Sequence, residues 1–121
     1  MDDEKQKDLL YQNGLKYYKE QKYFEAHEMW EDLWSDFYLE DRKFIQGLIQ
    51  LSVSFVHIGN GNINGAKSLL KKSRDKFCMF SGIHRNISLA RLLSQIELVK
   101  VEYDNLENLS EFNWDIIPDL K

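Results

Sequence analysis

The segment from Phe44 to Ile58 limits the possible folds of this chain more than any other part of the sequence. Written as an α-helix, it is apolar around almost its whole circumference, and a helix of this kind is usually enclosed by other elements of a core. Polar residues interrupt it, and it is too short to cross a bilayer. We therefore expect a central helix surrounded by further helices, and no membrane-spanning segment.

Other segments repeat apolar residues at the three- and four-residue steps of an amphipathic helix. They cover residues 5–19, 23–37, 63–77 and 86–104. Gly59 to Asn62 is expected to form a tight turn after the central helix, with Asn62 as the N-cap of the next one. Ser81-Gly82 is expected to break the chain before the last helix. The tail after residue 105 is too apolar to be free, so we expect it to lie against the bundle.

The predicted fold class is all-α, a compact bundle of about five helices built from antiparallel helical hairpins. Gly14 lies inside the first helix and indicates close packing there. Tetratricopeptide-like spacings occur twice, first at Gly14, Tyr17, Ala26 and Trp30 and then at Ser54, His57, Ala66 and Leu70. Two such units are too few for a solenoid, so a closed bundle is favoured.

The composition fits one globular domain over residues 1–121. The chain has 43% apolar residues, 13% aromatic residues and a formal net charge of −4, which is typical of a folded domain. Cys78 is the only cysteine, and its apolar neighbours predict a buried side chain rather than a nucleophile. The single cysteine and the lack of a basic-then-apolar leader favour a cytoplasmic location.

Basic residues gather in one part of this otherwise acidic chain. They are Lys67, Lys71, Lys72, Arg74, Lys76, Arg85 and Arg91, with Asp75 as the only acidic residue among them. A solvated face of an amphipathic helix explains them better than an anion or nucleic-acid site, because no aromatic residues alternate with them. Nucleic acid is therefore not an expected partner, and no cofactor is indicated. Tryptophans that seem placed at the surface would suit a homodimer.

A polar line marks the two central helices and supplies the candidate site. It consists of His27, Glu28, Glu31 and Trp34 on the 23–37 helix and Gln46, Gln50 and His57 on the central helix. Each group shares one edge of its helix, although Glu28 points further toward solvent. A buried polar group without a hydrogen bond costs about 1–3 kcal/mol, so these side chains should meet one another, water or a ligand.

Several interpretations of the polar line remain open. It is either a self-satisfied network that fixes helix register, or a pocket between the two helices that binds a small ligand or a protein partner. The alternative to a binding module is a hydrolase, metal-dependent or acid–base, that uses His27, Glu31 and His57. No bound metal is expected, because Glu31 occupies the position of the second histidine in a zincin motif.

The same positions resemble a known family, and the pattern is Tyr23-Phe24-Glu25-Ala26-His27-Glu28, Glu31, Trp34, Gln46-Gly47-Leu48-Ile49-Gln50, His57, Gly61-Asn62 and Gly65-Ala66. It is similar to the domain-of-unknown-function 309 family of bacteria and archaea over roughly residues 10–80. The resemblance implies a compact all-α domain, often an entire short protein, and it implies no activity. Residues after Phe80 agree only loosely with the family.

Overall fold

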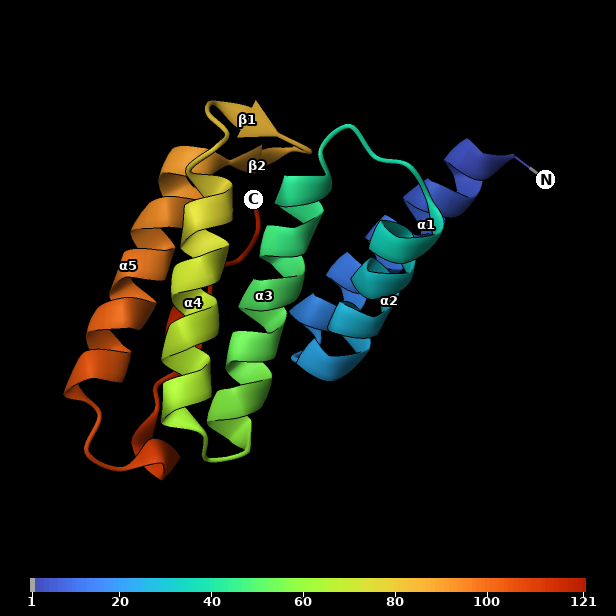
Figure 1. Cartoon of the computed structure of the whole chain (residues 1–121). Helices are drawn as coiled ribbons and strands as arrows, with labels where there is room; N and C mark the ends of the chain where they lie inside the picture. Colours follow the sequence, from blue (N-terminus) through green and yellow to red (C-terminus); the bar gives the residue numbers. More distant parts are fainter. Residues whose placement is uncertain (1) are drawn as a thin grey trace.

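The computed structural model describes residues 2–121, which form a bundle of five α-helices with a short two-stranded sheet (Figure 1). The helices are α1 (Asp3–Lys19), α2 (Tyr23–Asp36), α3 (Arg42–Gly59), α4 (Ile63–Phe77) and α5 (Leu89–Asn105). The strands β1 (Ile83–His84) and β2 (Ile87–Ser88) lie between α4 and α5, and the 3-10 turns η1 (Leu109–Glu111) and η2 (Trp114–Ile116) follow α5. The predicted all-α fold class is confirmed.

Each α-helix packs on the next one along the chain, in antiparallel hairpins (Figure 1). The α1–α2 pair forms one side of the bundle, α3 and α4 form its middle, and α5 lies at the opposite edge beside α4. This order places α3 between α2 and α4, and α3 packs on both of them.

α3 is the central helix that the sequence predicts. Phe44, Ile45, Leu48 and Leu51 are completely buried, and Phe55 is 1% exposed. Burying each such side chain contributes about 1.5–3 kcal/mol to stability. No helix of the described residues, α3 included, is long and apolar enough to span a membrane.

α1 and α2 approach each other most tightly at Gly14. The indole of the fully buried Trp30 lies against this glycine, and a Cβ atom added there would be 2.1 Å from the Trp30 Nε1 atom. The same indole N–H donates a hydrogen bond to the Tyr11 carbonyl oxygen at 3.2 Å. The close packing predicted from a glycine inside a helix is therefore confirmed.

The turn between α3 and α4 carries the predicted cap. Gly61 has a φ angle of +79°, and the Asn62 Oδ1 atom accepts a hydrogen bond from the Gly65 N–H at 2.9 Å. This bond satisfies one of the free N–H groups at the start of α4. The last helix begins later than predicted, at Leu89, because the N-cap of α5 is Ser88.

The chain between α4 and α5 contains a β-hairpin that the sequence analysis did not predict. β1 and β2 pair antiparallel around Arg85 and Asn86, whose φ angles of +48° and +64° are uncommon for residues other than glycine. Ile87 is 1% exposed and anchors the hairpin in the core. The hairpin thus replaces the simple break expected near Gly82.

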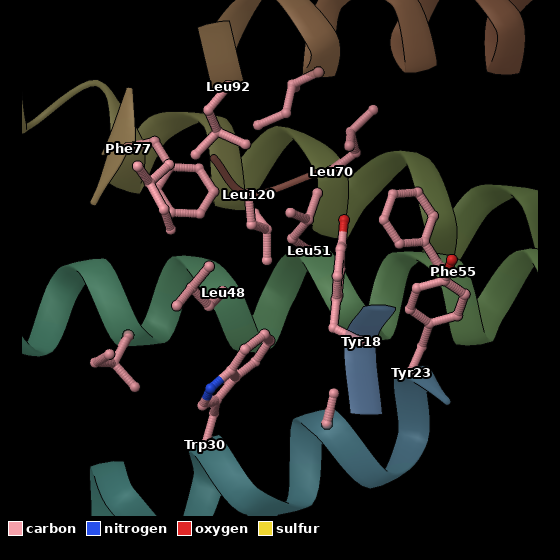
Figure 2. Close-up of a cluster of buried hydrophobic side chains, with 14 of the residues drawn as sticks. Tyr18, Tyr23, Trp30, Leu48, Leu51, Phe55, Leu70, Phe77, Leu92 and Leu120 are labelled. Atoms are coloured by element: carbon pink, nitrogen blue, oxygen red, sulfur yellow. The ribbon is translucent and has the colours of Figure 1, made fainter. Parts of the chain in front are cut away.

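The chain after α5 folds back over the bundle and enters the core with Leu120, which is 4% exposed (Figure 2). The buried Tyr18 hydroxyl donates a hydrogen bond to the Pro118 carbonyl oxygen at 2.7 Å. The backbone N–H of Ser88 donates to the carbonyl oxygen of Lys121 at 3.0 Å. The tail therefore links α1 to the start of α5.

Two expectations about surface residues are wrong. Cys78 is exposed, because it lies at the C-cap of α4 rather than inside the helix. Trp30 is fully buried, and Trp34 and Trp114 are half-buried, so no tryptophan is exposed. The argument for a homodimer from exposed tryptophans is therefore lost.

Candidate functional site

His27 and Glu31 lie one turn apart on the outer edge of α2. The Nδ1–H group of His27 donates to the Phe24 carbonyl oxygen at 3.0 Å, since a carbonyl oxygen can only accept. Its Nε2 atom lies 3.9 Å from a Glu31 carboxylate oxygen, which is beyond hydrogen-bond distance. The two side chains are 23% and 53% exposed. They therefore form a solvent-screened pair without a hydrogen bond between them.

Trp34 completes this edge near the C-terminal end of α2. The guanidinium carbon of Arg42 lies 3.9 Å from its ring centroid, in a cation–π contact. The Trp34 Nε1–H group is buried and has no hydrogen-bond partner within the described residues. A buried indole N–H usually finds an acceptor, so α2 holds one unused donor.

Gln46 and Gln50 form the polar side of α3, and both side chains are half-buried. The Oε1 atom of Gln50 is buried and has no hydrogen-bond partner in residues 2–121. A self-satisfied network requires its buried polar atoms to be paired. The buried atoms of Gln50 and Trp34 are therefore not hydrogen-bonded to other seam side chains.

His57 belongs instead to the turn between α3 and α4. The Asn62 Nδ2–H group donates to His57 Nδ1 at 3.3 Å, and the ring lies beside Gly65. Since Asn62 is also the cap of α4, His57 supports that cap. Within the described chain, no three His, Cys, Asp or Glu side chains are grouped in a way that could hold a metal ion. The structure therefore does not bring His27, Glu31 and His57 together as a set of metal ligands.

The remaining polar residues form what we call the α2–α3 seam, made of His27, Glu28, Glu31, Trp34, Gln46 and Gln50. Five hollows stand out on the surface of residues 2–121, and none is lined by a seam residue.

α2 gives the seam a strongly acidic flank. The helix has no lysine or arginine, and its acidic residues are Glu25, Glu28, Glu31, Asp32 and Asp36. Phe24 is 52% exposed, and its ring centroid lies 5.2 Å from that of His27. An apolar ring thus adjoins a run of negative charge.

The structure also joins three residues that sequence reasoning did not connect. Asp41 precedes α3 but does not cap it, because its carboxylate accepts hydrogen bonds from His84 Nε2 at 2.8 Å and from Arg85 Nη2 at 3.0 Å and Nε at 2.5 Å. Burial alone would raise the pKa of Asp41, but these hydrogen bonds outweigh it and hold the pKa below its ordinary value.

This Asp41–His84–Arg85 cluster ties the β-hairpin to the loop between α2 and α3. Arg85 also lies over the ring of Tyr11, at 4.6 Å from the centroid. The carboxylate is fully used by its two partners, so we interpret the cluster as a latch between elements. No local sequence pattern indicates it, because Asp41 and His84 are 43 positions apart.

The seam lies in a part of the chain that is similar to a known family. Residues 11–69 match the family model described as "Domain of unknown function (DUF309)". Over these residues the chain is similar to the DUF309 family. The matched region contains every seam residue, whereas the β-hairpin and α5 lie outside it. The resemblance seen in the sequence is thus confirmed, and the seam lies in the DUF309 part of the chain.

The chain is also similar to a curated protein. The chain is 32% identical over 102 residues to "Uncharacterized protein YpuF" of Bacillus subtilis (strain 168). The alignment covers 79% of this chain but 55% of the relative, so the chain spans about half the length of that relative. No solved structure matches the chain.

Proposed function

We propose that the DUF309 domain of this chain is a binding module that holds a basic segment of a partner protein along the α2–α3 seam. The observation that carries the proposal is that two neighbouring helices each hold a buried group without a hydrogen-bond partner in residues 2–121, the Trp34 N–H donor on α2 and the Gln50 carbonyl acceptor on α3. Each costs about 1–3 kcal/mol while it lacks a partner. A bound segment that supplies an acceptor and a donor would remove that cost.

The backbone of a peptide segment offers both kinds of group in every residue except proline. A small shift of the neighbouring side chains is needed to reach the two atoms, because both are covered in the free chain. None of the five hollows is lined by a seam residue, so the seam suits a segment that lies across it better than a ligand enclosed on all sides.

The charge of the seam selects the partner. α2 carries only acidic charges, and Glu28 makes no ion pair among residues 2–121. A segment rich in lysine or arginine would find complementary charge along this flank, which favours encounter and fixes orientation. The exposed Phe24 ring gives such a segment an apolar or cation–π contact at one end.

Selection from a phage-displayed library of random peptides on the immobilised whole chain tests this function. We expect the selected peptides to be enriched in lysine and arginine. Their affinity, measured by fluorescence anisotropy, should fall at least about tenfold, or about 1.4 kcal/mol, in the Glu28→Lys variant. The matched control is Glu97→Lys, which reverses an exposed charge on α5 and should leave the affinity unchanged.

A second variant separates binding from stability. Gln50→Leu removes the unpaired acceptor and should weaken peptide binding while the melting temperature stays constant or rises, because no hydrogen bond is lost. Selected peptides without basic enrichment, or equal losses in Glu28→Lys and Glu97→Lys, would show that the seam is not the binding surface.

A further inference from the structure

A hollow of about 260 Å³ lies between α4 and α5, on a different part of the bundle from the seam. Its floor is apolar and almost completely buried. Leu70 is 3% exposed, Ile96 is completely buried and Tyr103 is 1% exposed. The Tyr103 hydroxyl is used inside the core, 3.0 Å from Ser54 Oγ. The floor therefore offers an aromatic ring and aliphatic carbons, with no free polar group.

The rim of the same hollow is basic. It carries Lys67, Lys71, Arg74 and Lys100, with Asp104 as its single acidic residue. Asp104 lies 3.5 Å from the ammonium group of Lys67 and 3.1 Å from that of Lys100. Within the described residues, Lys71 and Arg74 have no ion pair. Two uncompensated cations thus stand over an apolar floor.

We propose that this hollow binds a small amphipathic organic anion, such as an aryl or alkyl phosphate or carboxylate. The apolar body would lie on the floor formed by Leu70, Ile96 and Tyr103. The anionic group would lie between Lys71 and Arg74, where the planar guanidinium can donate two parallel hydrogen bonds to a phosphate or carboxylate. Attraction of the anion and burial of its apolar part act together at one place.

The structure separates the basic residues of α4 into those that line the hollow and those that do not. Lys72 is exposed on the same helix but does not line the hollow, whereas Lys71 and Arg74 do. A solvated lysine face would treat these residues alike, since exposed charges act through a screened common field. A site would not. Lys72 is therefore an internal control for the proposal.

Calorimetric titration of the whole chain with phenyl phosphate, inorganic phosphate and benzyl alcohol tests the site. Phenyl phosphate should bind at least about tenfold more tightly than either of the other two, because only it satisfies both the floor and the rim. A Lys71→Ala, Arg74→Ala double variant should weaken phenyl phosphate binding about tenfold or more. Lys72→Ala should leave it within about twofold.

Several results would overturn the proposal. Equal affinity for phenyl phosphate and inorganic phosphate would mean that the floor contributes nothing. Equal losses in Lys72→Ala and the double variant would mean a diffuse basic face. Displacement of phenyl phosphate by an acidic peptide at far lower concentration would assign the hollow to a protein partner. The altered side chains are solvent-exposed, so circular dichroism should show unchanged folding in each variant.

Discussion

At the scale of single residues, the tightest contact of the bundle predicts the effect of one methyl group. A Cβ atom at position 14 would lie 2.1 Å from Trp30 Nε1. The indole is fully buried and hydrogen-bonded to the Tyr11 carbonyl oxygen, so it has no free space to move into. We expect Gly14→Ala to lower the free energy of unfolding in urea titrations by about 1–3 kcal/mol through overpacking.

The control for this prediction is Gly59→Ala. A Cβ atom at Gly59 meets nothing within 4 Å, and the residue lies at the end of α3. Alanine there should leave stability unchanged or raise it by up to about 1 kcal/mol, because it restricts the unfolded chain. Similar losses at both positions would show that backbone propensity, rather than contact with Trp30, sets the cost.

Single residues also show the limit of helical-wheel reasoning. A wheel gives the side of the helix on which Gln50 or Trp34 lies, because that side follows from spacing alone. It does not give rotamers or hydrogen-bond partners. His57 therefore could not be separated from the seam, although its partner Asn62 lies only 5 positions away.

At the scale of elements, the helices could be predicted and the β-hairpin could not. Each helix is long enough to show several turns of apolar periodicity. The strands have 2 residues each, too few to show alternation. Their Arg85-Asn86 turn also lacks the glycine that usually marks a two-residue hairpin. The latch through Asp41 was therefore beyond sequence reasoning, because it needs the position of the hairpin.

The hairpin latch makes stability depend on pH in a defined direction. The pKa of Asp41 in the folded chain lies below its ordinary value, which is about 3.9 in an unfolded chain. Its contribution is therefore complete above that unfolded value and is lost as the pH falls through the lower folded value. Asp41→Asn should cost about 1–2 kcal/mol at neutral pH, after allowance for solvent screening.

Urea titrations at neutral pH and at about pH 3 check this prediction. The difference in stability between the two pH values should be smaller in Asp41→Asn than in the unaltered chain, because the titrating carboxyl is gone. Glu40→Gln is the matched control, since Glu40 is exposed and makes no ion pair among residues 2–121. If Glu40→Gln reduces the pH dependence as much, the latch does not carry it.

At the scale of the whole molecule, one apolar cluster joins the helices to the tail. Residues from α1 through α5 belong to it, together with Phe112 and Leu120. The central position of α3 could be inferred from its apolar circumference, since few other arrangements bury such a helix. The path of the tail could not be inferred, because residues 105–121 have no regular period and their docking depends on where α1 and α5 lie.

The tail contributes a buried side chain, Leu120, to the core. A substitution of Leu120 therefore measures how much the tail stabilises the fold. Its side chain is 4% exposed, and its φ angle is +58°. Leu120→Ala should lower the free energy of unfolding by about 2–4 kcal/mol, through lost burial and the cavity left behind. Because glycine relieves the left-handed backbone strain, Leu120→Gly should be no less stable than Leu120→Ala, contrary to the usual order of these residues.

The matched control is Leu98→Ala, which removes the same side-chain atoms from an exposed position, since Leu98 is 58% exposed on α5. Leu98→Ala should change stability by less than about 0.5 kcal/mol. Hydrogen exchange at the Ser88 N–H reports the docking directly, because this group donates to the Lys121 carbonyl oxygen at 3.0 Å. Leu120→Ala should speed that exchange more than exchange within α3. If Ser88 stays protected while the whole chain loses stability, the bond to Lys121 does not depend on the burial of Leu120.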